Sequence, residues 1–361
     1  MNSLQRFFQD KRVLITGHTG FKGSWLSLCL SHLGAEVFGY SLPPQKESHY
    51  HIIGLSHRLA GEVFEDIRSK EVCIKVLSDF NPNIIFHLAA QPLVKQGFIH
   101  PEETFDINIM GTVSLLEVIR KLYRPVVVVI ITSDKCYSVI EKKDTFFCEE
   151  DRLGGIDPYS ASKAAVEIIC DSYRRSFFPP EDLYQHKICL ATVRAGNVIG
   201  GGDFAADRII PDIFRSIIDE KPVILRNPDA VRPWQHVLEP LYGYLLLAKR
   251  LMEDGDPDLC SSFNFGPAES DCLTVQELVN VFFRYWPDNC VNSIVQPENF
   301  HETSVLRLNV TKSWEKLRWK PTWDVHEAVS RTVMWYHNYY CGKIRNSQQS
   351  LKDIEDYQNS L

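Results

Sequence analysis

One stretch near the N-terminus decides the fold: Arg12-Val-Leu-Ile-Thr-Gly-His-Thr-Gly-Phe-Lys-Gly23. Its first five residues are mostly β-branched or aliphatic and predict a buried strand over Arg12–Thr16, and the residues after it predict a helix over Lys22–Leu33. The glycines that join them form the pattern G-x-x-G-x-x-G. Such a loop between a strand and a helix is typical of dinucleotide binding, because glycine lets the backbone approach a pyrophosphate and the helix N-terminus offers free N–H groups to it.

Downstream of this unit, short β-branched runs alternate with helical patterns through the N-terminal half. We expect further strands over Glu36–Tyr40, Val63–Asp66, Asn83–His87, Val126–Thr132 and Lys187–Arg194, and helices over Ser69–Asp79, Glu102–Leu122 and Asp157–Ser176. This alternation is typical of a parallel sheet that is covered by helices on both faces. The predicted fold class is therefore α/β, a Rossmann-type doubly wound parallel sheet.

The regular alternation ends near residue 197. Residues 1–196 predict the dinucleotide-binding domain, and residues 197–341 predict mainly a smaller, interleaved C-terminal substrate-binding domain. Segments near 234–266 are expected to return to the main sheet, with a strand at Phe263–Phe265. Residues 342–361 are polar, and we expect a solvated tail or an end helix there.

Composition excludes several classes of protein. Hydrophobic residues at 44% and charged residues at 24% suit an ordinary soluble globular chain, and the net charge of −7 without a long basic run argues against nucleic-acid binding. The ten cysteines form no CxxC pair, so we expect no structural zinc and no other metal. No stretch approaches the roughly 20 apolar residues that span a bilayer, and the N-terminus lacks a long apolar signal region. We expect a cytoplasmic enzyme.

Two groups of titratable side chains are candidates for chemistry. Tyr159 and Lys163 are four residues apart and share a helix face, although a surface pair with this spacing is common. A phenol with a reference pKa of about 10 needs a nearby cation to act as a base near neutrality. Ser133, Asp134 and Lys135 follow the expected fifth strand, and the last two would otherwise form a surface ion pair.

The order of the motifs resembles the extended short-chain dehydrogenase/reductase family, from Lys11 to about Trp323. The motifs that carry this resemblance are the glycine loop, His87-Leu-Ala-Ala90, Thr132-Ser133 and Tyr159-Ser-Ala-Ser-Lys163. The resemblance implies that Tyr159 is the acid/base for a sugar hydroxyl and that Ser133 hydrogen-bonds the reacting oxygen. It also implies that Lys163 lowers the pKa of the tyrosine and binds the nicotinamide ribose.

The same resemblance implies a nicotinamide cofactor. The residues expected to hold it are Gly17, His18, Thr19, Gly20, Phe21, Lys22, Gly23, Asp66, Ile67, Leu88, Ala89 and Ala90, together with Tyr159 and Lys163. An acid at the end of the second strand usually binds the ribose of NAD, but here that strand ends Gly39-Tyr40-Ser41. Lys22 beside the phosphates would suit the additional phosphate of NADP. We expect NAD.

The residues after the Ser/Thr position distinguish the reactions of this family, because dehydratases carry an acid and a base there and epimerases carry small residues. The chain resembles most closely the branch that dehydrates CDP-glucose, through the motifs Thr16–Leu26, Gly39–Pro43, His87–Val94, Thr132–Tyr137, Arg194–Asp203 and Arg232–Val237. This implies that Lys135 removes the C5 proton of the sugar and that Asp134, with a raised pKa, protonates the departing C6 hydroxyl. The alternatives are dehydration of GDP-mannose or dTDP-glucose, C4 epimerisation, or a non-catalytic dinucleotide sensor.

A nucleoside diphosphate sugar also needs cations and polar side chains around it. The expected substrate-binding residues are Gln91, Asn197, Arg208, Arg232, His301, Glu302 and Arg307. The arginines suit the diphosphate, because a guanidinium group binds phosphate through two parallel hydrogen bonds. The resemblance further implies a homodimer that pairs through the helix of Tyr159 and Lys163.

Overall fold

The computed structural model describes residues 3–122, 124–139, 146–287, 292–296, 306–342 and 346–361. Its centre is a seven-stranded sheet in the order β12-β7-β5-β4-β1-β2-β3, in which every pair of neighbours is parallel. The strands are β1 (Arg12–Thr16), β2 (Glu36–Ser41), β3 (Gly61–Phe64), β4 (Ile84–His87), β5 (Val126–Ile131), β7 (Ile188–Ala195) and β12 (Ser262–Phe265). This order is that of a doubly wound sheet, so the predicted fold class is confirmed.

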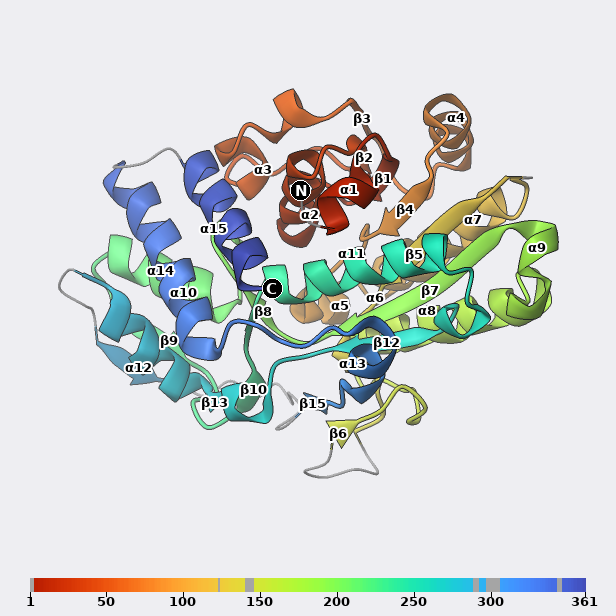
Figure 1. The fold of residues 1–361 in the computed structure, drawn as a ribbon. Helices are drawn as coiled ribbons and strands as arrows, with labels where there is room; N and C mark the ends of the chain where they lie inside the picture. The colour runs from red at the N-terminus through yellow and green to blue at the C-terminus, as the bar shows by residue number, and fades with distance from the viewer. Residues whose placement is uncertain (1–2, 123, 140–145, 288–291, 297–305, 343–345) are drawn as a thin grey trace.

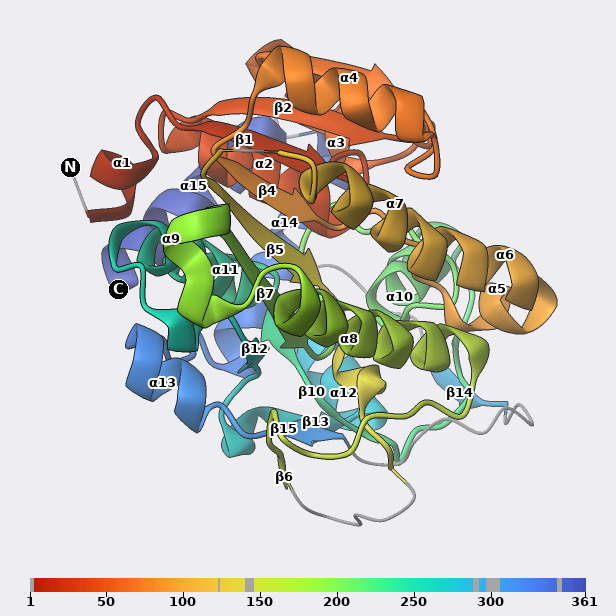
Figure 2. The same cartoon turned by 90° about the vertical axis from the view of Figure 1, so that its right-hand side faces the viewer.

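Helices cover both faces of the sheet and form three layers (Figure 2). One face carries α4 (Lys70–Phe80), α7 (Gly111–Ile119) and α8 (Pro158–Ser176), whose buried side chains form one apolar core. The other face carries α2 (Phe21–His32) and α11 (Leu238–Glu253), within a second and larger core. β5 is buried along its whole length between these two layers, which explains its continuous aliphatic sequence.

Two expected boundaries were wrong. β3 spans Gly61–Phe64 rather than Val63–Asp66, because Asp66 accepts hydrogen bonds from Arg68 in the turn that follows the strand. The expected long helix over Glu102–Leu122 is divided into α6 (Pro101–Phe105), a π-helical turn and α7. The π-helical turn (Asp106–Met110) contains the buried Asn108, which explains the interruption as a local adjustment around a polar side chain.

Asn108 holds the loop after β4 against α8. Its Oδ1 atom accepts a hydrogen bond from the Gln91 backbone N–H at 2.8 Å, and its Nδ2 group donates to Ser162 Oγ at 2.8 Å. The Thr112 hydroxyl donates to the Asn108 carbonyl at 2.7 Å and satisfies a backbone acceptor in the widened turn. Loop and helix thus become one rigid unit beside Tyr159.

Some of the remaining helices gather at one end of the molecule, away from α4 and α7 (Figure 1). The helices are α1 (Ser3–Phe8), α3 (His49–Ile52), α5 (Val94–Ile99), α9 (Leu183–His186), α10 (Ile209–Ile218), α12 (Val275–Tyr285), α13 (Thr311–Leu317), α14 (Val325–Cys341) and α15 (Asn346–Ser360), of which α10, α12 and α14 form this end. Four short pairs of strands connect them: β8 (Val198–Ile199) with β11 (Gln235–His236), β9 (Val223–Leu225) with β14 (Ser293–Val295), β10 (Val231–Pro233) with β13 (Cys272–Thr274), and β6 (Phe146–Phe147) with β15 (Arg307–Leu308). As predicted, the segment near 234–266 returns to the main sheet, through α11 and β12.

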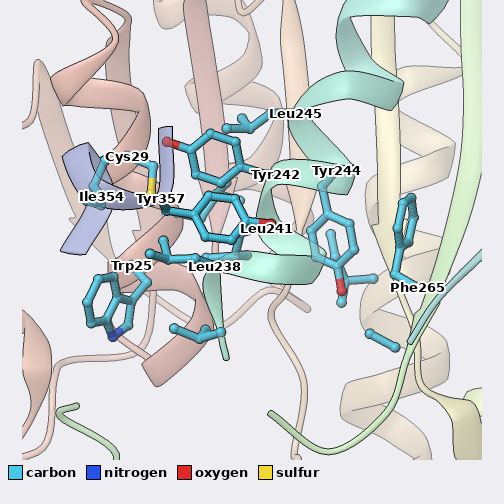
Figure 3. Close-up of a cluster of buried hydrophobic side chains, with 14 of the residues drawn as sticks. Trp25, Cys29, Leu238, Leu241, Tyr242, Tyr244, Leu245, Phe265, Ile354 and Tyr357 are labelled. Carbon is cyan, nitrogen blue, oxygen red and sulfur yellow. The ribbon is translucent and has the colours of Figure 1, made fainter. Parts of the chain in front are cut away.

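The C-terminal residues form a packed helix, so the expectation of an end helix is confirmed and that of a solvated tail is wrong. α15 contacts α2 and α14, and its Ile354 and Tyr357 are completely buried. Figure 3 shows both side chains beside Cys29 of α2 and Tyr242 of α11. The polar composition misleads because three of its polar side chains, Gln349, Ser350 and Asp353, are also buried. Among the described residues, no helix is long and apolar enough to cross a membrane.

Candidate active site

The carboxyl ends of β1, β4, β5 and β7 lie at one edge of the sheet, where ligands bind in open α/β folds. The glycine loop follows β1, which lies next to β4 at the point where the strand order reverses. Gly17 has a φ of +76°, and a Cβ atom on it would lie 2.8 Å from the Ala89 backbone nitrogen. A Cβ atom on Gly23 would lie 2.1 Å from the Gly17 carbonyl oxygen. Both positions therefore require glycine.

The first turn of α2 suits an anion. Gly20 is the N-cap residue and is exposed, so no side chain covers the first N–H groups of the helix. These groups and the helix dipole favour a pyrophosphate. The loop after β4 closes the other side, where the Leu88 and Ala89 N–H groups donate to Thr16 Oγ1 at 3.1 and 3.2 Å, with Ala90 next in the chain. The glycine cradle and the free helix N-terminus fit the phosphates of a dinucleotide.

His18 points away from this cradle. It is completely buried, its Nε2 atom lies 3.0 Å from Glu62 Oε2, and a Cβ atom on Gly39 would lie 2.4 Å from its ring. Burial lowers the pKa of His18, and the hydrogen bond to Glu62 opposes this shift. The Glu62 carboxylate also accepts hydrogen bonds from Tyr50 and Ser56. Glu62 thus lies beside β2, opposite Gly39, but its oxygens already accept hydrogen bonds from side chains of the protein.

Thr19, Asp66 and Ile67 were also predicted to bind the cofactor, and each makes contacts within the protein. Thr19 is half-buried and hydrogen-bonds Ser41 Oγ at 2.9 Å, which fixes the tip of the loop against the end of β2. The Asp66 carboxylate forms an ion pair with Arg68 Nη2 at 2.6 Å, and this contact lowers the pKa of Asp66. Ile67 is buried against Gly111 of α7 and therefore belongs to the apolar core.

Phe21 and Lys22 direct their side chains toward the substrate edge of the cradle. A Cβ atom on Gly200 would lie 3.3 Å from Phe21 Cζ, so this ring packs under the loop after β8. Desolvation lowers the pKa of Lys22 to about 8; Arg208 and Lys163 lower it further, and Asp134 opposes them. Lys22 is thus part of a charged cluster with the catalytic candidates.

Asp134 has the environment expected of a general acid. It is 3% exposed, directly after β5, and accepts a hydrogen bond from Ser133 Oγ at 2.9 Å. Burial raises its pKa above the ordinary value, while Lys135, Ser133, Lys22 and Arg232 oppose the shift. A carboxyl group whose proton is held more tightly than usual can donate it to a leaving hydroxyl near neutral pH.

Ser133 and Lys135 flank this carboxyl group. Ser133 is the N-cap of a short 3₁₀ helix (Asp134–Cys136), and its Oγ atom accepts the Lys135 N–H at 3.3 Å. Lys135 is half-buried, and its positive charge acts on Asp134. The pair is therefore not an ordinary surface ion pair, because its acidic member is buried.

Tyr159 begins α8 and is nearly buried, at 9% exposure. Burial raises the pKa of its phenol to about 12; hydrogen bonding to Ser133 and the charge of Arg208 lower it, and Asp134 raises it. The sequence reasoning assigned the helpful cation to Lys163. In the structure, the cation whose charge lowers the pKa of Tyr159 is Arg208.

Lys163 lies one turn further along α8, and its Nζ group donates to the Ile131 carbonyl at 3.2 Å. Burial lowers the pKa of Lys163 to about 8, and the Glu167 carboxylate one turn later opposes this shift. Glu167 is 1% exposed and pairs with Arg194 Nη2 at 2.8 Å. Burial by itself would raise the pKa of Glu167, but Arg194 and the Thr132 and Thr192 hydroxyls lower it below its ordinary value.

Two of the predicted substrate arginines lie beside these groups. Arg208 precedes α10, and its charge acts on both Tyr159 and Lys22. Its Nη1 group pairs with Asp203 Oδ2 at 2.8 Å, an interaction that keeps its pKa raised although burial opposes it. Arg232 lies on β10, and its charge acts on Asp134. The edge of the sheet thus brings an acid, a phenol and several cations together.

A family model described as GDP-mannose 4,6 dehydratase matches residues 14–332. The chain belongs to this family. A curated relative, CDP-glucose 4,6-dehydratase from Salmonella typhimurium, is 43% identical over 99% of this chain and 98% of its own length. The resemblance to the extended short-chain dehydrogenase/reductase family that the motifs predicted is thereby confirmed.

Solved structures of lower identity share the fold of this dehydratase family member. A UDP-glucose 4-epimerase from Stenotrophomonas maltophila, solved with NAD and formylated UDP-arabinopyranose, matches with a TM-score of 0.78 and 19% identity over 92% of this chain and 100% of its own. A dTDP-glucose 4,6-dehydratase from Bacillus anthracis in complex with NAD matches with a TM-score of 0.73 and 21% identity, over 91% of this chain and 97% of its own. Both confirm the fold.

Other predicted substrate residues of this family member lie at varied positions. Asn197 follows β7 at the sheet edge, and its carbonyl accepts the Gln235 N–H at 3.4 Å. The Gln91 side chain is already used within its loop, because it donates to Thr104 and accepts from the Leu93 N–H. Arg307 lies on β15, 3.5 Å from Glu269 and over the ring of Phe146. His301 and Glu302 lie outside the described residues.

Sequence reasoning missed Glu167 and Asp203, which support Lys163 and Arg208. One signal for Glu167 was present, since Tyr159, Lys163 and Glu167 recur at intervals of four on one face of a helix. Asp203 had no such signal, because its contact with Arg208 is set by the fold of the loop between β8 and α10. The structure therefore adds two carboxylates to the site, each of which interacts with one of its cations.

Proposed function

We propose that this chain is a CDP-glucose 4,6-dehydratase, which converts CDP-D-glucose to CDP-4-dehydro-6-deoxy-D-glucose and water. The observation that carries the proposal is the buried carboxyl group of Asp134, with its raised pKa, beside Tyr159 at the sheet edge that also carries the glycine loop. Dehydration needs such an acid and C4 epimerisation does not. The choice of CDP-glucose rests on the relative with 43% identity over nearly the whole chain.

The cofactor of this reaction is NAD, held by the glycine loop, the first turn of α2 and the backbone after β4. When bound, the nicotinamide supplies a hydride acceptor for C4 of the sugar and a hydride donor for C6. Tyr159 and Lys163 would hold the nicotinamide ribose at the start of α8. The cradle around Gly17 and Gly23, which a Cβ atom would fill, supports this assignment.

The first proton transfer belongs to Tyr159, which takes the proton from the C4 hydroxyl. A phenol with a pKa of about 12 is a poor source of phenolate at neutral pH, so the neighbouring cations and the Ser133 hydroxyl must favour its charged form. Arg208 already acts in this direction, and Lys163 adds a further charge. Ser133 also orients the reacting oxygen.

The elimination belongs to Asp134 and Lys135. After oxidation at C4, the C5 hydrogen lies next to a ketone, and Lys135 removes it while Asp134 donates its proton to the departing C6 hydroxyl. Burial of Asp134 supports the direction of this transfer, because it favours the protonated carboxyl group.

The substrate is anchored by its phosphates and its sugar. Arg208 and Arg232 bind the diphosphate, and Asn197 with the loop of Gln91 borders the sugar. Arg307 contributes to nucleotide binding from residues 197–341, which serve as the substrate-binding domain next to the dinucleotide-binding domain of residues 1–196. The charges of Arg208 and Arg232 on Tyr159 and Asp134 support the first two assignments.

The direct test is to incubate the protein together with NAD and one sugar nucleotide at a time: CDP-glucose, dTDP-glucose, GDP-mannose or UDP-glucose. We expect a 4-keto product, detected by its absorbance in alkali, with CDP-glucose above the others, and one solvent deuterium at C5 when the reaction runs in D₂O. A C4 epimer without a 4-keto product would replace the proposal with epimerisation. Unchanged product formation by Lys135→Ala would remove Lys135 as the base.

The protein also forms a homodimer through α8. Ile168 on α8 is 58% exposed, and Ile99, Phe105 and Met110 are exposed on the neighbouring α5, α6 and π-helical turn. Exposed apolar side chains grouped on adjacent helices are typical of a subunit interface. Light scattering should give a dimer for the wild type and a monomer for Ile168→Glu. A monomeric wild type would contradict this part.

A further inference from the structure

A buried chain of hydrogen bonds joins the C-terminal helix α15 to the first turn of α2. Trp335 Nε1 of α14 donates to Ser350 Oγ of α15 at 2.9 Å, and Ser350 Oγ lies 3.0 Å from His49 Nε2. The other ring nitrogen, His49 Nδ1, lies 2.9 Å from Ser24 Oγ. Ser24 in turn donates to the Phe21 carbonyl at 2.9 Å, at the start of α2.

The direction of every bond in this chain follows from its ends. Burial lowers the pKa of His49 to about 3, so the ring is neutral and has one donor and one acceptor nitrogen. The Ser24 hydroxyl already donates to Phe21, so His49 Nδ1 must donate to Ser24. His49 Nε2 is then the acceptor, and the Ser350 hydroxyl donates to it while accepting from the indole of Trp335.

Packing holds His49 in this orientation. Its ring stacks on Trp25 at 4.7 Å with an interplanar angle of 9°, and Trp25 Nε1 donates to the Gly201 carbonyl at 2.9 Å. A Cβ atom on Gly202 would lie 2.6 Å from His49. The His49 ring is therefore closely packed by Trp25 and Gly202. If Ser350 is replaced, the ring cannot rotate to compensate without changing its hydrogen bond to Ser24.

We propose that Ser350 is a positioning residue for the cofactor, because through His49 and Ser24 it fixes the first turn of α2, whose N–H groups receive the pyrophosphate. The inference rests on the proposed use of NAD. It assigns a function to a C-terminal residue that lies 327 positions after Gly23 in sequence numbering (350 − 23 = 327). A merely structural role, in which Ser350 only docks α15, is the competing explanation.

Tyr357 supplies a matched control on the same helix. Its hydroxyl donates to Glu239 Oε2 at 2.7 Å, and its ring packs 4.7 Å from Tyr242 and 4.9 Å from Trp323. Tyr357→Phe therefore removes a buried hydrogen bond that docks α15 but leaves the chain through His49 intact, whereas Ser350→Ala removes the bonds to both Trp335 and His49. Both substitutions only delete atoms, so both variants should fold.

The experiment measures NAD binding by calorimetry, without sugar, for the full-length wild type, Ser350→Ala and Tyr357→Phe. We expect Ser350→Ala to raise the Kd for NAD about three- to tenfold, the effect of losing the buried hydrogen bond between Ser350 and His49. Amide hydrogen exchange of residues 20–24 should also accelerate in Ser350→Ala. Tyr357→Phe should keep the Kd within about twofold and the exchange of these residues unchanged, whatever its loss of thermal stability.

Equal Kd values for the wild type and Ser350→Ala would overturn the inference, as would equal increases in both variants. Absence of NAD binding by the wild type would overturn it too, together with the proposed cofactor. The Kd values for NAD are measured without sugar, so they can be compared even if the protein does not dehydrate CDP-glucose. The two proposals can therefore fail separately.

Discussion

Asp203 accepts a hydrogen bond from Arg208 at 2.8 Å and holds that guanidinium where its charge acts on Tyr159. The Asp203 side chain is 8% exposed, and its backbone carbonyl accepts a further hydrogen bond from the Tyr336 hydroxyl of α14. Phe204, the next residue, packs against Trp335 and Tyr339 at 6.4 and 5.6 Å. The loop that carries Arg208 is thus fixed from behind by α14.

Replacement of Asp203 by Asn should weaken substrate binding more than turnover. Without the carboxylate, Arg208 loses a charged partner and a fixed orientation, so we expect KM for CDP-glucose to rise about tenfold with a smaller change in kcat. Asp207→Asn is the control, because Asp207 pairs with Arg226 on the surface. Steady-state kinetics of the two variants checks this, and equal KM values for both would contradict it.

Replacement of Tyr159 by Phe should abolish the first oxidation. Loss of a general base costs about 10²- to 10⁴-fold in rate, so kcat should fall by this factor. Tyr173→Phe is a control on the same helix, since Tyr173 bonds Glu117 at 2.9 Å. If Tyr159→Phe retained more than about a tenth of the wild-type kcat, the assigned base would be wrong.

Asp134 should determine the alkaline limb of the pH profile. The acid acts in its protonated form, so activity falls as pH rises through its pKa, which burial holds above the ordinary value. Asp134→Asn should lower kcat about 10²- to 10³-fold and remove that limb from the profile of the residual activity. Asp157→Asn changes the cap of α8, where Asp157 Oδ1 accepts the Ser160 N–H, but leaves Asp134 in place, so it should keep the limb.

Glu239 should make the protein less stable as pH rises. Burial raises its pKa to about 7 in the folded state, against the hydrogen bonds from Trp323, Tyr357 and Thr322. A carboxyl group with a raised folded pKa contributes stability below its unfolded pKa of about 4, and this contribution is lost between about pH 4 and pH 7.

Glu239→Gln lacks this titration. The difference between its free energy of unfolding and that of the wild type should therefore change by up to about 3 kcal/mol in favour of the variant from pH 4 to pH 8. Denaturant unfolding across this range measures the difference. Exposed Glu253, at the other end of α11, is the site for the control variant Glu253→Gln, which should follow the wild type. Parallel curves for Glu239→Gln and the wild type would refute the expectation.

Much of the fold was predictable because its signals are local. The aliphatic run of β5 and the glycine loop after β1 depend on neighbours in the chain, and so does the Tyr159–Lys163 spacing on α8. The place of Asp134 after a strand, at the edge of the sheet, was also predictable from the local pattern. Its raised pKa follows from burial at the carboxyl end of a parallel sheet.

The parts that could not be predicted depend on distant contacts. The burial of His18 against Gly39 and Glu62 requires β2 and β3 to be in place, and the position of Lys22 among Asp134 and Arg208 requires the loop after β8. The polar residues of α15 gave no sign of burial, because their partners are His49, Trp335 and Arg331, far away in the sequence. The periodicity of apolar residues in a sequence predicts a helix, but it does not predict which other elements pack against that helix.

The docking of α15 also limits how this protein can be engineered. Leu361 is 61% exposed, so an affinity tag appended after it points into solvent and should be harmless. A shortened chain is different: deletion of the final helix would uncover apolar surface on α2 and α11 and remove the support of His49 in one step. A laboratory that trims this end to help crystals grow should obtain an aggregating protein instead.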